Sequence, residues 1–151
     1  MKYLLILLLI VSSLTLKAQV KLLTLSELEQ RVAKGKDTTY VINFWATWCG
    51  PCRKYIPLLN VIHQKYADKL AVVGLSNENE AAVKSFNDPK INYFEAIDTE
   101  GTLMSQLEVK GIPHVILIDP KGIVRWEGYP LLTGYPLTEK VLTDLMEKYK
   151  N

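Results

Sequence analysis

The chain contains only two cysteines, Cys49 and Cys52, and they stand three residues apart in a sequence of 151 residues. Two cysteines this close cannot form the disulfide framework of a small secreted fold, so a packed hydrophobic core has to stabilise the chain. The composition permits such a core, because 48% of the residues are hydrophobic and 23% are charged. Disorder, collagen-like repeats and a coiled coil are poor descriptions of this composition. The length predicts one domain. The cysteine pair needs a chemical explanation, because it does not serve as a disulfide framework.

Residues 1–18 have the pattern of a secretory signal peptide. Lys2 is followed by nine consecutive apolar or aromatic residues, Tyr3–Val11, and the segment ends at the small residue Ala18. The apolar stretch is short for a hydrocarbon core of ~30 Å, which a helix crosses with ~20 residues. A cleaved signal is therefore favoured over an uncleaved anchor or a buried helix. We predict a signal peptide at 1–18, a domain at 19–151 and export to the periplasm, where unprotected thiols tend to be oxidised.

Basic and acidic residues balance once the predicted signal is set aside. The whole chain has a formal net charge of +2, but residues 1–18 contain two lysines and no acid. The remaining residues therefore carry 16 basic and 16 acidic side chains. A neutral domain gives no electrostatic reason to expect nucleic acid or anionic lipid as a partner.

Helix and strand patterns alternate along the rest of the chain. Helical spacing or capping signals predict helices at 25–33, 51–66, 78–87, 101–107 and 137–149. Apolar and β-branched runs predict strands at 39–45, 70–75, 93–97, 114–119 and 123–127, the last two forming a hairpin. Pro57 is expected to interrupt and kink the second helix, because it cannot donate a backbone hydrogen bond. This alternation predicts an α/β fold with a central mixed β-sheet flanked by helices on both faces.

The cysteine pair lies between the first long strand and the helix that contains Pro57. Helical spacing of three brings two Cα atoms to ~5–6 Å, which a disulfide bond accepts. Cys49 is expected at the helix N-terminus, where backbone N–H groups and the helix dipole lower a thiol pKa from ~8.5 toward ~7. Cys52 lies one turn further in and is better shielded, which suits a resolving thiol. The pattern favours thiol–disulfide exchange.

Other interpretations of the C-x-x-C pair remain open. A structural zinc site needs four ligands, and only His63 and His114 are available to join the two thiols. A copper chaperone could use both thiols with His114, because soft thiolates select Cu(I). A purely structural disulfide across so short a loop would constrain the unfolded chain little. We predict no metal and no cofactor, and copper binding is the alternative function.

The residues from Phe44 to Cys52 resemble the active-site strand and loop of the thioredoxin superfamily, whose W-C-G-P-C motif is matched by Trp48-Cys49-Gly50-Pro51-Cys52. Pro57 resembles the kinking proline of that superfamily, and Gly111-Ile112-Pro113 resembles its cis-proline loop. With the export signal, the chain is similar to TlpA/ResA-type exported thiol-disulfide oxidoreductases from about residue 25 onward. A peroxidase is a weaker interpretation, because Ala46 stands where the peroxidatic pattern has threonine.

The resemblance implies a thioredoxin-like fold in which Cys49 is the exposed nucleophile and Cys52 the resolving thiol of a redox-active disulfide. It further implies supporting roles for Trp48, Gly50, Pro51, Ile112 and Pro113. Trp48 would shield the disulfide and contact partners, and Pro113, in a cis peptide, would position the partner's extended chain. The Gly-Pro pair and Ile112 are similar to those of reducing members.

The resemblance also implies partners. These are disulfide-bearing client proteins and, as the reductant, a membrane thiol transporter of the DsbD/CcdA type. The resemblance suggests that the protein serves cytochrome c maturation or cell redox homeostasis. We expect a monomer that reduces its clients.

Two carboxylates that are typical of the family are missing from this chain. Thioredoxins have a buried aspartate at the position of Asn43, and TlpA/ResA-type proteins often have a glutamate at the position of Tyr55. The proton of Cys52 would then be handled by water, by Tyr55 or by a carboxylate from elsewhere in the chain. We expect the thiol-releasing step to be slower, or more dependent on pH, than in relatives that have the carboxylate.

Overall fold

The structure of the protein is a computed structural model that describes residues 22–34 and 37–150. The predicted signal peptide, with its end at Ala18, lies outside the described residues. Within the described ranges, no helix is long and apolar enough to cross a membrane.

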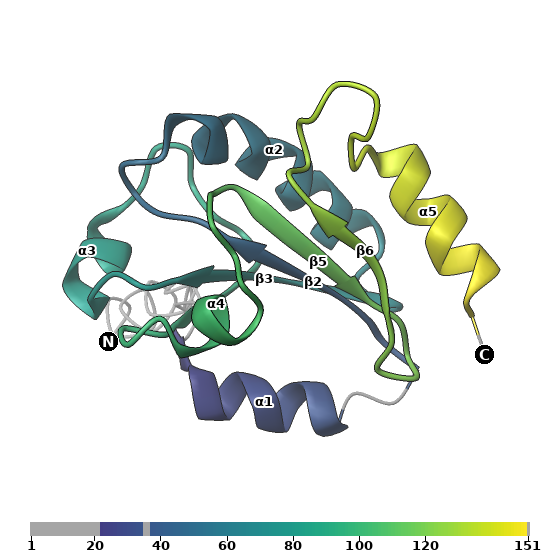
Figure 1. Cartoon of the computed structure of the whole chain (residues 1–151), viewed down its shortest axis with the longest axis horizontal. Coiled ribbons are helices and arrows are strands. Elements are labelled where there is room, and N and C mark those ends of the chain that lie inside the picture. Colours follow the sequence, from purple (N-terminus) through teal and green to yellow (C-terminus); the bar gives the residue numbers. More distant parts are fainter. Residues whose placement is uncertain (1–21, 35–36, 151) are drawn as a thin grey trace, which may run out of the picture.

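Six strands form one mixed sheet in the order β1-β4-β3-β2-β5-β6 (Figure 1). Neighbouring strands on the β1 side of β2 are parallel, whereas β5 is antiparallel to β2 and β6 is antiparallel to β5. The strands are β1 (Leu23–Thr24), β2 (Thr39–Phe44), β3 (Leu70–Ser76), β4 (Phe94–Ile97), β5 (His114–Ile118) and β6 (Val124–Gly128). The predicted α/β fold with a central mixed sheet is confirmed.

Helices cover both faces of the sheet, because side chains along each strand alternate between two apolar cores. The first core lies under α2 (Gly50–Lys65), α3 (Glu80–Ser85) and α5 (Glu139–Lys148). The second core lies under α1 (Leu25–Lys34) and α4 (Thr102–Gln106). In β2, Val41 faces the first core, and so does Trp45, which follows the strand directly. Ile42 and Phe44 face the second core.

The element bounds differ from the predicted ones where side chains cap the helices. In α3, the Asn79 side chain accepts the Ala82 N–H, so the helix begins two residues later than predicted. In α5, Thr138 caps the helix in the same way, by accepting the Val141 N–H. Helix α2 runs from Gly50 to Lys65 with Pro57 inside it, and the kink expected at Pro57 stays a prediction. Pro57 lies on the exposed side, where water can bond the carbonyl that the proline leaves unpaired.

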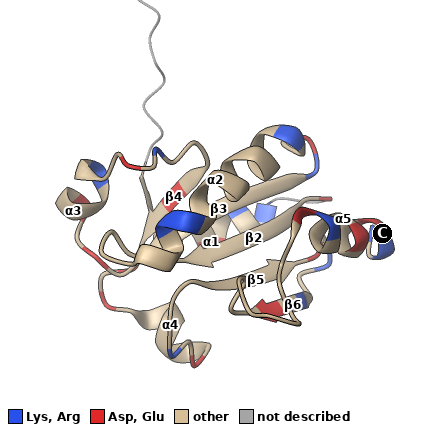
Figure 2. Ribbon diagram, turned by 90° about the horizontal axis from the view of Figure 1, so that it is seen from above, with Lys and Arg blue, Asp and Glu red and all other residues tan. Residues whose placement is uncertain are grey.

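Basic and acidic residues are interspersed along the helices and loops (Figure 2). The pairs Lys84–Glu80 and Lys140–Asp144 lie one helical turn apart on α3 and α5. This distribution agrees with a domain that has no strong field of one sign.

Candidate redox-active site

Both cysteines lie at the first turn of α2, directly beyond the end of β2. Cys49 is the N-cap of the helix, with an extended backbone (φ −82°, ψ 102°), and its sulfur accepts the Cys52 N–H at 3.2 Å. A disulfide joins Cys49 to Cys52, and their Cα atoms lie 5.2 Å apart. This separation lies in the predicted range, so the local backbone accommodates the bond.

The expected exposure of Cys49 is wrong for the disulfide form. Cys49 is only 3% exposed and Cys52 is fully buried. The reason is that the Cys49 sulfur points inward, toward the Cys52 sulfur and backbone N–H. The protruding group is Trp48, which is 72% exposed. A partner that approaches the disulfide therefore meets the indole first.

The loop before β5 lies at the same end of the sheet as the cysteine pair. The Ile112–Pro113 peptide bond is cis, as the resemblance implied, and Pro113 is buried. Strand β5 begins at His114, which pairs in register with Phe44 at the end of β2. A second cis peptide bond, Asp88–Pro89, was not predicted from the sequence.

The loop between β6 and α5, residues 129–137, begins at the same end of the sheet as the cysteine pair. Gly128 at the end of β6 pairs with Val115 near the start of β5. Its exposed apolar side chains are Tyr129, Leu131, Leu132 and Tyr135. The buried Tyr55 of α2 anchors the loop, because its hydroxyl donates to the Leu137 carbonyl at 2.9 Å. Burial also raises the pKa of Tyr55 well above its ordinary value of 10.0. Tyr55 is therefore a structural anchor and a poor proton acceptor near neutral pH.

The carboxylate of Glu78, a residue predicted to start a helix, holds the loop that carries Trp48. The two oxygens of Glu78 accept the backbone N–H and the hydroxyl of Thr47, both at 2.7 Å. Ser76 supports the same carboxylate, because its hydroxyl donates to Glu78 at 3.2 Å. Glu78 follows β3 and Thr47 follows β2, and parallel neighbouring strands end at one edge. That adjacency depends on the strand order, so the sequence alone carries no signal for this contact of Glu78.

We expect Glu78→Ala to lower the free energy of unfolding by about 1–3 kcal/mol, because it leaves the Thr47 donors without their acceptor. Urea unfolding of the oxidised protein measures this loss. Glu100→Ala is the matched control, since Glu100 is an exposed glutamate on the turn before α4, and we expect a change below about 0.5 kcal/mol. Equal effects of the two substitutions would contradict a role for Glu78 in holding the loop.

The two histidines considered as metal ligands have other partners. His63 Nδ1 accepts the Val72 N–H at 3.4 Å, and burial with the nearby charge of Arg31 lowers the pKa of His63. His114 Nε2 lies 3.1 Å from a carboxylate oxygen of Glu127. Among residues 22–34 and 37–150, no three His, Cys, Asp or Glu side chains gather as a metal site would require.

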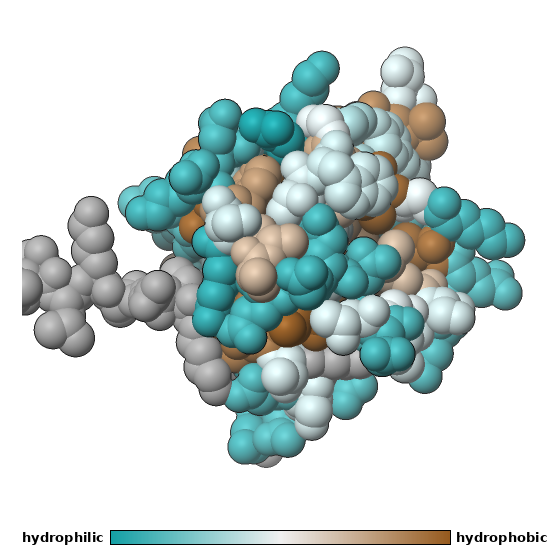
Figure 3. Space-filling model, turned by 90° about the vertical axis from the view of Figure 1, so that its left-hand side faces the viewer, coloured by the Kyte–Doolittle hydropathy of each residue, from teal (hydrophilic) through white to brown (hydrophobic). Residues whose placement is uncertain are grey.

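A shallow groove of about 260 Å³ lies beside the cysteine pair, between the Trp48 loop and α3. Thr47, Arg53 and Phe86 line it, and Arg53 pairs with Asp88 at 3.2 Å. On the side of the molecule where α3 lies, hydrophilic side chains border smaller apolar areas (Figure 3).

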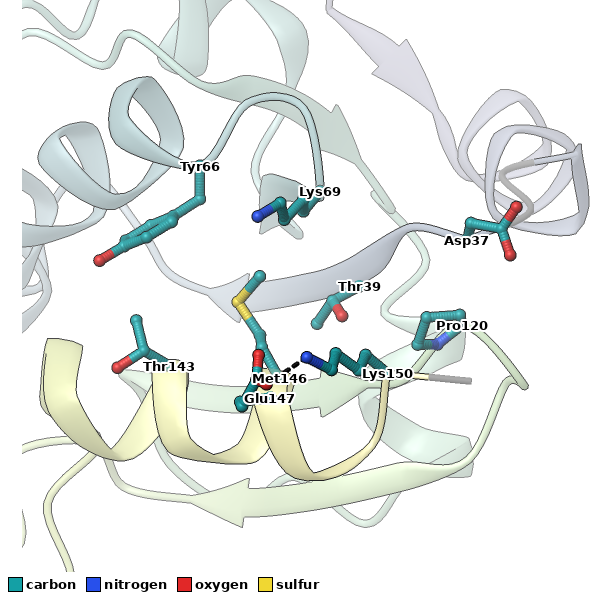
Figure 4. Close-up of a pocket in the computed structure, with 9 residues that line it drawn as sticks. All are labelled: Asp37, Thr39, Tyr66, Lys69, Pro120, Thr143, Met146, Glu147 and Lys150. Carbon is teal, nitrogen blue, oxygen red and sulfur yellow. Dashed lines mark hydrogen bonds and ion pairs between the residues drawn. The ribbon is translucent and has the colours of Figure 1, made fainter.

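A larger cavity of about 370 Å³ lies away from the cysteines (Figure 4). Thr39 at the start of β2, Pro120 beyond the end of β5, and Met146 of α5 are among its lining residues. The cysteines follow the other end of β2, so this cavity is not part of the redox site.

The strand order, the helix that begins at the cysteine pair and the cis-proline loop beside it define a thioredoxin-like fold with a C-x-x-C disulfide. Residues 12–127 match the AhpC/TSA family, and the chain belongs to this family. The recognised resemblance to the thioredoxin superfamily and its ResA-type members is confirmed by the relatives below.

Curated relatives are similar over most of the described domain. The thioredoxin-like protein YneN of Bacillus subtilis is 34% identical over 97 residues, which are 62% of this chain and 56% of YneN. The thiol-disulfide oxidoreductase ResA of Bacillus thuringiensis subsp. konkukian is 35% identical over 101 residues, 65% of this chain and 57% of ResA. The chain thus spans a little over half the length of the curated relatives it matches.

Solved structures share the fold. A putative thiol:disulfide interchange protein DsbE from Chlorobium tepidum superposes with a TM-score of 0.66 and 26% identity, covering 82% of this chain and 85% of that one. StoA from Bacillus subtilis superposes with a TM-score of 0.60 at 24% identity, covering 75% of this chain and 85% of StoA.

Proposed function

We propose that this protein is a thiol–disulfide oxidoreductase that reduces disulfide bonds of client proteins through the Cys49–Cys52 couple. The observation that carries the proposal is the disulfide at the N-terminus of α2, in which the Cys49 sulfur accepts the Cys52 N–H. Once the bond is reduced, the same N–H and the positive end of the helix dipole favour a thiolate at Cys49. The similarity to thiol-disulfide oxidoreductases such as ResA supports this activity.

The reaction takes two exchange steps. The Cys49 thiolate attacks one sulfur of a client disulfide, which forms a mixed disulfide and releases the other client sulfur as a thiolate. Cys52 then loses its proton and attacks the Cys49 sulfur, which releases the second client thiolate and closes the Cys49–Cys52 bond. Two electrons pass from the protein to the client.

The residues around the couple are given supporting roles in this proposal. Trp48 contacts the client, since it is a large hydrophobic side chain that is 72% exposed beside the cysteine pair. The cis peptide before Pro113 positions the client's extended chain beside the disulfide. Gly50 and Pro51 between the cysteines, with Ile112 before Pro113, favour the reducing direction by resemblance. No metal or cofactor enters the reaction.

The proposal includes export and a source of electrons. Residues 1–18 act as a signal peptide, and the domain at 19–151 works in the periplasm as a monomer. A reductant in an oxidising compartment has to be reduced again after each turnover. A membrane thiol transporter of the DsbD/CcdA type supplies these electrons, and clients in cytochrome c maturation or redox homeostasis receive them.

The reduction potential of the Cys49–Cys52 couple tests the direction of transfer. We expect a value near −270 mV, as for thioredoxin, whereas a value near about −120 mV would identify an oxidant and contradict the proposal. Insulin reduction driven by dithiothreitol tests the activity, and it should disappear in Cys49→Ser. Stoichiometric Cu(I) on the purified protein, lost in the same variant, would favour the copper chaperone instead.

A further inference from the structure

We propose that Glu95 of β4 takes up the proton that Cys52 releases, and that it acts through the buried polar groups of Asn43 and Tyr93. The inference rests on the proposed exchange reaction and supplies the carboxylate that the sequence lacks at positions 43 and 55. Glu95 is a positioning residue in this scheme, because it acts through other groups and not by touching the sulfur.

The sheet register places Glu95 on the face that α2 covers. Asn43 of β2 pairs with Gly74 of β3, and Gly74 pairs with Glu95 of β4. Alternation along the strands puts all three on the face of the first core, with Val41, Val72 and Tyr93. Strands lie about 4.8 Å apart, so two strand spacings put the Cα atoms of Asn43 and Glu95 about 10 Å apart.

Gly74 keeps the space between Asn43 and Glu95 free of a side chain from β3. A Cβ atom at Gly74 would lie 3.0 Å from Trp45 Nε1 and 3.1 Å from a ring carbon of Tyr93. Atoms of two aromatic rings therefore lie where a side chain at position 74 would begin, and one of them is the polar Trp45 Nε1. A side chain at position 74 would displace both rings.

Four polar atoms in this region are buried without a hydrogen-bond partner among the described residues. They are Nδ2 and Oδ1 of Asn43, Nε1 of Trp45 and the hydroxyl of Tyr93. The Tyr93 hydroxyl lies beside the Asn43 amide, close enough for the amide to act on the pKa of Tyr93, although the two do not form a hydrogen bond of normal geometry. Unpaired buried polar atoms are costly, and such groups usually bind internal water. Trp45 and Tyr93 belong to the same buried cluster as Cys52, and we assign the path of the proton to this cluster.

Glu95 has the properties that the end of such a path requires. Among the described residues, the Glu95 carboxylate forms no ion pair and no hydrogen bond, and the side chain is only partly exposed. Burial raises the pKa of Glu95 from its ordinary value of 4.5 to about 7. Near neutral pH both protonation states are populated, and the partial exposure allows exchange with solvent.

No charged partner adds to the effect of burial on the pKa of Glu95. Next to its strand, Tyr93 interacts with the charge of Glu95, and Tyr55 of α2 interacts with Tyr93 in turn. Burial raises the pKa of both hydroxyls. β2 contributes the uncharged Asn43, and β3 contributes Gly74. The charges of α3 pair with each other, Lys84 with Glu80. We therefore expect the protonation of Glu95 to respond to a new charge at the cysteines.

The proton balance of the resolving step follows directly. Cys52 S–H releases its proton to water held by the buried polar groups of Asn43 and Tyr93, and the Glu95 carboxylate takes up a proton from that water. The Cys52 thiolate attacks the Cys49 sulfur of the mixed disulfide. The Cys49–Cys52 bond forms, the bond from Cys49 to the client sulfur breaks, and the client leaves as a thiolate. Glu95 then returns the proton to solvent from its partly exposed position.

The first test is a carbon-13 NMR titration of the Glu95 carboxyl group in the wild-type protein, oxidised and reduced. The negative charge of a thiolate at the cysteine pair disfavours a second negative charge nearby, so it should raise the titration midpoint of Glu95 in the reduced protein, by up to about one pH unit. Midpoints that agree within about 0.2 unit in the two redox states would overturn the proposal. No client protein is needed, so this result is independent of the proposed activity.

The second test is the resolving step itself, in a single turnover. A chromophoric thiol is attached to Cys49 as a mixed disulfide, and its release by Cys52 is followed as a function of pH. In the wild type the rate should rise through about pH 7, and Glu95→Gln should remove this rise and slow the release about tenfold or more at pH 8. The matched control Glu100→Gln should leave rate and profile unchanged.

A Glu95→Gln profile that coincides with the wild-type profile would overturn the role of Glu95. Failure to reduce insulin, with this chromophoric release intact, would instead contradict the proposed function and leave the role of Glu95 standing. Glutamine has the shape of glutamate, and the NMR titration uses the unmodified chain, so the inference is tested even if the variant is unstable.

Discussion

Cys52→Ser should turn the protein from a catalyst of disulfide reduction into a trap for its clients. Cys49 remains at the N-cap of α2, so its thiolate still attacks a client disulfide. The resolving sulfur is gone, and the serine hydroxyl is too weak an acid and nucleophile to break the mixed disulfide. We expect turnover of insulin to fall by at least about a thousandfold. Mass spectrometry should find one client chain covalently attached at Cys49.

Cys49→Ser is the matched control for this trap. It makes the same chemical change three residues earlier, but it removes the nucleophile, so neither turnover nor an adduct is expected. An adduct on Cys52 in the control, with none on Cys49 in the Cys52→Ser variant, would reverse the assigned roles. Residual turnover by Cys52→Ser would show that Cys52 is not the resolving thiol.

The fold was predictable from the sequence wherever one element carries its own signal. The apolar run at 39–45 predicts β2 without knowledge of its neighbours, and the helical spacing after Pro51 predicts α2. The cysteine pair lies between two such elements, so its place at a helix N-terminus also follows from local sequence. The short strand β1 escaped prediction, because two residues directly before a helix form no alternating pattern.

The parts of the site that depend on strand order could not be read from the sequence. The pattern at 93–97 predicts a strand, and Glu95 then looks like an ordinary polar position on it. Only the order β1-β4-β3-β2 places Glu95 in register with Asn43 across Gly74. The same holds for Glu78, which reaches Thr47 because β2 and β3 end side by side.

The burial of Cys49 shows a further limit of local prediction. Its position at the start of α2 was predicted, but exposure depends on which way the sulfur points. In the disulfide form the sulfur points toward Cys52, and Trp48 takes the exposed position.

Glu95→Gln should make the oxidised protein more stable above neutral pH. Because burial raises the pKa of Glu95 from 4.5 to about 7, the folded protein keeps a proton that the unfolded chain releases between these values. Stability is therefore lost as the pH rises through this window, and the loss is complete above about pH 7. The neutral glutamine avoids this loss, which is worth at most about 3 kcal/mol.

Chemical unfolding of the disulfide form at about pH 4 and about pH 8 measures this effect. Near pH 4 the wild-type carboxyl is largely protonated in both states, so the variant should gain little, whereas at pH 8 it should gain about 1–3 kcal/mol. Glu100→Gln should give no such pH-dependent difference. A gain of the same size at both pH values would mean that Glu95 is not protonated in the folded protein near neutral pH. Above neutral pH the charged Glu95 carboxylate therefore weakens the fold, so packing does not explain why a glutamate stands at this position. Uptake of the proton from Cys52 does give a reason for it.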